Sequence, residues 1–108
     1  MKHEFAIVEN KYIEGYDLQR HHYIYVDDEV ILKILKRLKI MKTYSHSLNR
    51  PDFGLIYWGI TLIPPESLAL FQDVILTVKN DENDEIPLLA AMVSEAIEKQ
   101  AYIIHYGI

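Results

Sequence analysis

The chain has 108 residues, of which 50% are hydrophobic and 25% charged, and this composition favours a single globular domain over residues 1–108. It contains no cysteine, which excludes disulfides, thiolate nucleophiles, zinc–thiolate sites and iron–sulfur clusters. Sixteen acidic and eleven basic residues give a net charge of −5, which argues against nucleic acid as a partner because a phosphate backbone repels an acidic protein.

Two short strands are expected near the N-terminus. Residues 3–9 alternate with a period of about two and place Phe5 and Ile7 on one face. Residues 21–26 are aromatic and β-branched, a composition typical of strands. Between them, residues 11–16 are expected to add a short strand or a turn.

A helix beginning at Asp27 is the most regular element expected. Acidic residues lie near its N-terminus and five cations lie between Lys33 and Lys42 near its C-terminus, which complements the helix dipole. Apolar residues recur at helical spacing and form a stripe that must pack on the core. The stripe consists of Val30, Ile31, Ile34, Leu35, Leu38 and Met41.

The middle of the chain is expected to hold a long loop and a buried strand. Residues 43–54 contain turn-forming residue types without sustained periodicity, which indicates a loop. Residues 55–63 are almost continuously apolar, as in a central strand covered on both faces. Gly59 within this run indicates a bulge or a close approach of two backbones.

Two further helices and a final strand complete the chain. The second helix follows Pro64 and Pro65, and the third follows an acidic segment in which Asp84 is a candidate N-cap. Residues 101–106 favour a closing strand. The predicted fold class is therefore α+β, with a single mixed β-sheet of about four strands and three packed helices in the order β-β-α-β-α-α-β.

Candidate catalytic residues are few. His46 and Arg50 lie in the 43–54 segment, where an imidazole could transfer a proton and a guanidinium could hold an anion, and His105 is a third candidate. Turn and capping chemistry is the favoured explanation of these residue types, because they commonly serve turns. No spaced ligand motif indicates a metal, and no cofactor is expected.

Candidate partner-binding residues are acidic or aromatic. Asp81, Glu82 and Asp84 crowd carboxylates ahead of the third helix, although the spacing of a calcium-binding loop is missing. The chain also has eight tyrosines, most of them in or beside expected strands, and tyrosine is enriched at interface hot spots. The tyrosines chosen as candidates are Tyr23, Tyr25 and Tyr44.

The sequence carries no phosphate loop, dinucleotide fingerprint or catalytic-triad motif. We therefore expect a non-catalytic module that binds a basic protein through an acidic, tyrosine-rich surface, as an inhibitor, antitoxin or immunity-type protein would. A small enzyme or anion-binding domain that uses the 43–54 segment is the alternative. Self-association through an aromatic edge strand and a cytoplasmic location without membrane contact are further expectations.

Overall fold

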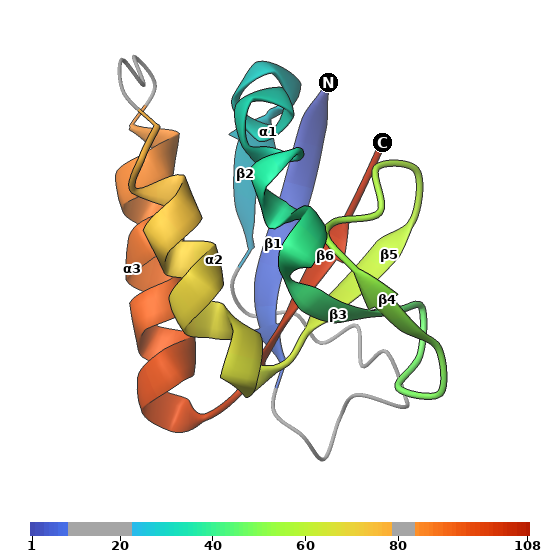
Figure 1. The fold of residues 1–108 in the computed structure, drawn as a ribbon. Coiled ribbons are helices and arrows are strands. Elements are labelled where there is room, and N and C mark those ends of the chain that lie inside the picture. The colour runs from blue at the N-terminus through green and yellow to red at the C-terminus, as the bar shows by residue number, and fades with distance from the viewer. Residues whose placement is uncertain (9–22, 79–83) are drawn as a thin grey trace.

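The computed structural model describes residues 1–8, 23–78 and 84–108. They contain a single six-stranded sheet with the order β2-β1-β6-β5-β3-β4, in which every pairing is antiparallel (Figure 1). The strands are β1 Lys2–Val8, β2 Ile24–Asp27, β3 Lys42–Ser45, β4 Pro51–Phe53, β5 Ile60–Ile63 and β6 Tyr102–Tyr106. The α+β class is confirmed, but the sheet has more than the four strands expected and is antiparallel rather than mixed.

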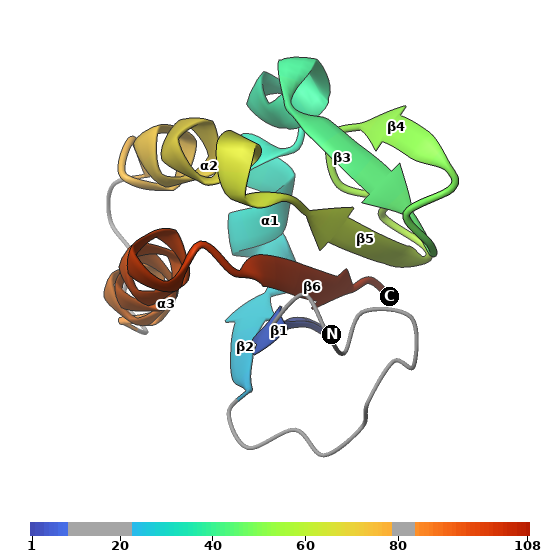
Figure 2. The same cartoon turned by 90° about the horizontal axis from the view of Figure 1, so that it is seen from below.

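Three α-helices lie on one face of this sheet, as Figure 2 shows. They are α1 Asp28–Ile34, α2 Leu68–Ile75 and α3 Glu85–Lys99, and the 3-10 turns η2 Arg37–Ile40 and η3 Pro65–Ser67 follow α1 and precede α2. None of the helices within the described residues has the length and hydropathy that a bilayer span requires.

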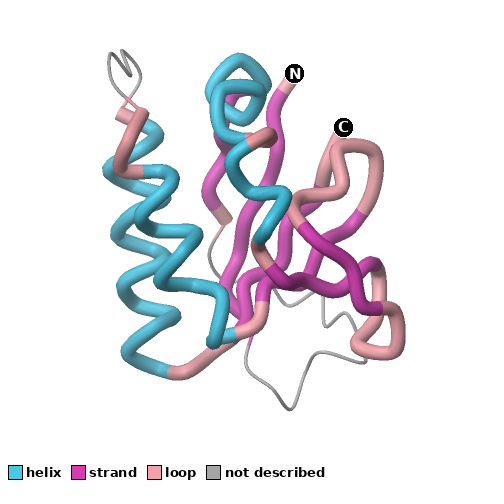
Figure 3. Tube along the Cα trace, in the orientation of Figure 1, coloured by secondary structure: helices cyan, strands magenta, loops and turns pink. Residues whose placement is uncertain are grey.

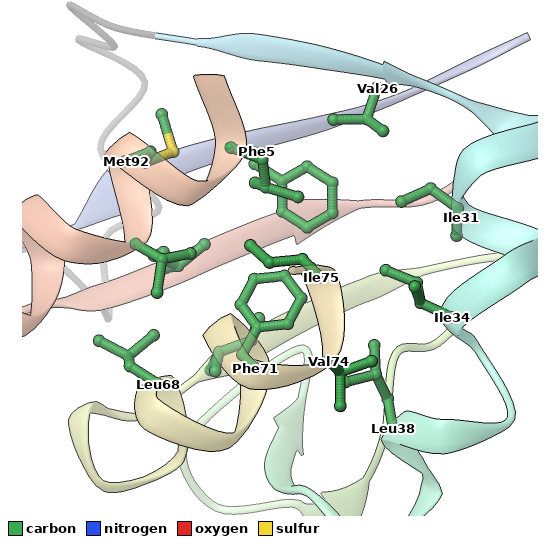
Figure 4. Close-up of a cluster of buried hydrophobic side chains, with 14 of the residues drawn as sticks. Phe5, Val26, Ile31, Ile34, Leu38, Leu68, Phe71, Val74, Ile75 and Met92 are labelled. Carbon is green, nitrogen blue, oxygen red and sulfur yellow. The ribbon is translucent and has the colours of Figure 1, made fainter. Parts of the chain in front are cut away.

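The main core lies between the helices and the inner face of the sheet (Figure 4). Phe5 of β1 and Phe71 of α2 are fully buried there with ring centroids 5.9 Å apart. Ile31 and Ile34 of α1 and Leu89 of α3 are equally buried. Each such side chain stabilises the fold by about 1.5–3 kcal/mol through burial, so this layer holds the helices in place.

The first helix keeps its predicted apolar stripe but ends early. All of its members are buried except Leu35, which is half-buried. Beyond Ile34 the backbone tightens: the Leu38 N–H donates to the Leu35 carbonyl, and the Met41 N–H donates to the Leu38 carbonyl. Because these residues lie three apart, a 3-10 turn buries them on the same side.

The expectation of a loop over residues 43–54 is wrong, because β3 and β4 form a hairpin there. Its turn is closed by the Ser45 N–H, which donates to the Arg50 carbonyl at 2.8 Å. Inside the sheet, the Thr43 hydroxyl donates to the carbonyl of Gly54. Tertiary pairing thus overrides the turn-like composition, and Pro51 is tolerated because β4 is an edge strand.

The strand expected over residues 55–63 is shorter than predicted, because only β5 pairs within the sheet and residues 55–59 form a turn. At Gly59, where a bulge or a close approach of two backbones was expected, the neighbouring group is a side chain, because a Cβ there would lie 2.7 Å from Nε2 of His46. Asp84 does precede α3, but its backbone is left-handed and its side chain makes no cap hydrogen bond. Residues 11–16 and the first two residues of the strand expected over 21–26 lie outside the described residues, and β2 begins at Ile24.

Candidate functional site

Two buried histidines meet on the inner face of the sheet. His3 projects from β1 and His105 from β6, and both are fully buried. Their rings stack with centroids 5.1 Å apart and planes inclined by 14°, and Nδ1 of His3 lies 2.8 Å from Nε2 of His105. His105 was a sequence candidate, whereas the only sequence signal for His3 was its inward position in the alternation of β1.

Hydrogen bonds extend this pair in both directions. Nε2 of His3 lies 2.9 Å from Oδ1 of Asp28 at the start of α1, and the Tyr57 hydroxyl donates to the same oxygen at 2.7 Å. On the other side, Nδ1 of His105 lies 3.4 Å from Oγ1 of Thr61 in β5. That oxygen accepts the backbone N–H of Ile56 at 2.8 Å. We call Asp28, His3, His105, Thr61 and Tyr57 the buried network.

When both histidine rings are neutral, the donors and acceptors of the buried network can be assigned in only one way. An ionised carboxylate only accepts, so Asp28 requires the proton of His3 on Nε2. Nδ1 of His3 then accepts from Nε2–H of His105, whose Nδ1 accepts the hydroxyl proton of Thr61. Every donor therefore points toward Asp28, and each buried ring nitrogen has a partner.

The environment sets the charges in this network. Burial, and to a smaller extent repulsion from His3, lowers the pKa of His105 to about 3. The hydrogen bond from Tyr57, followed by that from His3, lowers the pKa of Asp28. The same bond to Asp28 raises the pKa of Tyr57. His105 is therefore neutral and Asp28 is charged at neutral pH.

Both rings are fully buried, whereas a general acid or base must reach the reacting atom, so a catalytic role for His105 stays a prediction. In this structure the network joins β1, β5, β6, the start of α1 and the turn at residues 55–59. Among the described residues, no three histidine or carboxylate side chains are grouped as metal ligands.

The turn at residues 55–59 is held from two sides. From within, Oγ1 of Thr61 accepts the Ile56 N–H and the Asp28 carboxylate accepts the Tyr57 hydroxyl proton. From the C-terminus, the Gly107 N–H donates to the Gly59 carbonyl at 2.8 Å and the Ile108 N–H donates to the Tyr57 carbonyl at 2.9 Å. Figure 3 shows this loop beside the C-terminal end of the chain.

Carboxylates from three elements gather at one end of the molecule. Asp27 ends β2, Asp28 and Glu29 begin α1, and Glu85 begins α3, and these points are uppermost in Figure 1. The segments are bonded together, because the Glu85 carboxylate accepts the Asp27 N–H at 2.8 Å and pairs with Lys2. We call Asp27, Asp28, Glu29, Asp84 and Glu85 the acidic end.

The predicted partner-binding residues are only partly brought together. Asp84 is exposed and belongs to the acidic end, and Tyr25, with 54% of its surface exposed, lies two residues before Asp27 on β2. Tyr23 stacks on Tyr25 with centroids 6.5 Å apart. Tyr44 lies on β3, four strand spacings from β2, which is roughly 19 Å. Asp81 and Glu82 lie outside the described residues.

The residues of the catalytic alternative lie on different elements. His46 follows β3 with a left-handed backbone and its ring lies against Gly59. Arg50 is exposed in the hairpin turn, whereas His105 is buried beside His3. A ligand pocket that uses all three residues stays a prediction.

Comparison with known proteins adds no further constraint: no protein-family model, curated protein or solved structure matches this chain.

Proposed function

We propose that this chain is a small non-catalytic protein that binds a basic partner protein through its acidic end, as an inhibitor that masks a positively charged protein would. The observation that carries the proposal is the separation of charge. Residues 30–51 contain six cations and no carboxylate, and the rest of the chain contains 16 carboxylates and five cations. Five of those carboxylates form the acidic end, where Lys2 pairs with Glu85.

Such a charge distribution orients an approaching partner. A basic surface is attracted to the acidic end and repelled by the cations that follow along α1, η2 and β3. Electrostatic attraction of this kind raises the association rate and falls with added salt. The exposed ring of Tyr25 supplies contact area beside Asp27, since tyrosine loses little conformational entropy on binding.

The test is affinity capture from a lysate of the native host at low and at high salt, with three forms of the chain. The double variant Glu29→Lys/Asp84→Lys reverses two exposed charges of the acidic end. The control, Glu98→Lys, reverses one exposed charge roughly 20 Å away along α3. We expect one basic protein to be retained by the wild type and the control at low salt and released at high salt.

The double variant is expected to weaken retention of that protein about tenfold or more. Retention of the same protein by all three forms in both salts would show that the acidic end is not the binding surface. A partner of acidic character would contradict the proposal equally.

A further inference from the structure

The only tryptophan of the chain is also one of the most exposed large hydrophobic side chains among the described residues. Trp58 lies in the turn at residues 55–59 with 74% of its surface accessible. Tryptophan is highly buried on average, because its large apolar ring gains free energy on leaving water. A ring exposed to this degree therefore needs an explanation beyond the folding of the chain itself.

The backbone that carries Trp58 is fixed on both sides of the residue. Ile56 and Tyr57 before it are bonded to Thr61 and Asp28 of the buried network. After it, the Gly59 carbonyl accepts the Gly107 N–H. Tyr57 is thus tied to α1 and Gly59 to the residue that follows β6, while the indole itself is exposed.

Glycine at two positions makes this arrangement possible. A Cβ on Gly107 would lie 2.1 Å from the Tyr57 carbonyl oxygen, and a Cβ on Gly59 would touch the His46 ring at 2.7 Å. The C-terminal segment can therefore lie against the turn only because Gly107 has no side chain, whereas the missing side chain of Gly59 leaves room for the His46 ring. The indole is also supported by the Tyr57 ring, which packs against it at an interplanar angle of 86° with centroids 4.7 Å apart.

The turn borders the acidic end. Tyr57 stacks edge-on against Trp58 and donates its hydroxyl proton to Asp28, the first residue of α1. An indole fixed beside a group of carboxylates resembles an interface hot spot. In such a hot spot a rigid aromatic side chain is surrounded by polar groups. A side chain fixed before binding loses less entropy when the partner covers it.

We propose that Trp58 is the anchor by which the acidic end holds its basic partner, an inference that rests on the proposed function. The indole enters an apolar pocket of the partner and donates its Nε1–H to an acceptor there, while the exposed carboxylates of the acidic end, Glu29 and Asp84, face cations at the rim of that pocket. The buried network is the support that keeps this anchor in position.

The test uses 5-fluorotryptophan, which places a single fluorine reporter in the chain at Trp58. The probe is the fraction of host proteins that binds a cation exchanger, added at low salt. We expect the one ¹⁹F resonance to shift or broaden, and the shift to be absent when the probe is the protein fraction that does not bind the exchanger. A resonance unchanged by the basic fraction would overturn the inference.

Variants separate this inference from the proposed function. Trp58→Ala should accelerate dissociation of the captured basic protein about 30-fold or more, and Trp58→Phe should have a smaller effect because only the Nε1–H and part of the ring are lost. The control Ile97→Ala removes an exposed side chain of α3 roughly 20 Å from Asp84 along the helix, and it should leave dissociation unchanged. All three variants are expected to keep the circular dichroism of the wild type.

The outcomes are distinguishable. If Glu29→Lys/Asp84→Lys weakens capture and Trp58→Ala does not change dissociation, the acidic end binds without this anchor and the inference is wrong. If no basic protein is captured in either salt, the proposed function fails and the anchor fails with it.

Discussion

Acid should destabilise this protein well before its carboxylates are protonated, because His105 is buried as a neutral ring. The ring accepts a proton at a pKa of about 3 in the folded chain, against an ordinary value of 6.5 when it is exposed. Below pH 6.5 the His105 ring is therefore protonated in the unfolded chain but stays neutral in the folded chain. The stabilisation is fully present above pH 6.5 and is lost progressively as the pH falls toward 3.

The size of the effect follows from the two pKa values. Each pH unit between them lowers the free energy of unfolding by about 1.4 kcal/mol, which gives about 2 kcal/mol at pH 5 and about 4 to 5 kcal/mol at pH 3. A domain of this size has a total stability of about 5–15 kcal/mol. Asp28 acts in the same direction at lower pH, since its pKa is lowered on folding and its contribution is lost as the pH falls below 3.8.

The assay is urea denaturation followed by far-ultraviolet circular dichroism at pH 7 and pH 5, since the exposed Trp58 is a poor reporter of unfolding. The comparison is with His105→Gln, whose amide nitrogen can still donate to Nδ1 of His3 but does not titrate. The wild type should lose about 2 kcal/mol more than the variant between the two pH values. Equal losses would refute the argument that His105 is held neutral by the fold.

Three further changes test the contacts around the site. Tyr57→Phe removes the principal hydrogen bond that lowers the pKa of Asp28, so a carboxyl titration by NMR should show that pKa rising toward its ordinary value. Glu85→Ala leaves the Asp27 N–H without its acceptor and should lower the free energy of unfolding by about 1–3 kcal/mol in urea denaturation. Phe71→Ala empties the centre of the core and should cost about 3–5 kcal/mol in the same assay, and a loss below about 1 kcal/mol would contradict the packing described.

The spacing of apolar residues along the chain was sufficient to predict that helices pack on a sheet in this fold. The apolar stripe from Val30 to Met41 is buried as its spacing indicated, and β1 and β6 occupy the predicted strands. The hairpin at residues 42–53 was missed because its strands are short and carry polar and turn-forming residues. Their pairing depends on contacts with β5, which periodicity within the segment does not report.

The candidate site was harder to predict because its groups are distant in sequence. His3 and His105 are 102 positions apart and meet through the pairing of β1 with β6. The register of two strands joined by so long a connection cannot be read from either strand alone. Trp58 could be noticed in the sequence as an aromatic residue beside Gly59, but its exposure follows from the tertiary contacts of the turn.

The association rate constant between this chain and its captured partner, measured over a series of salt concentrations, bears most directly on the role of the acidic end. We expect the rate constant to fall steeply with salt, and at low salt to fall about tenfold for Glu29→Lys/Asp84→Lys while Glu98→Lys stays close to the wild type. A rate constant that depends on neither salt nor these reversed charges would contradict the assignment of the acidic end as the binding surface.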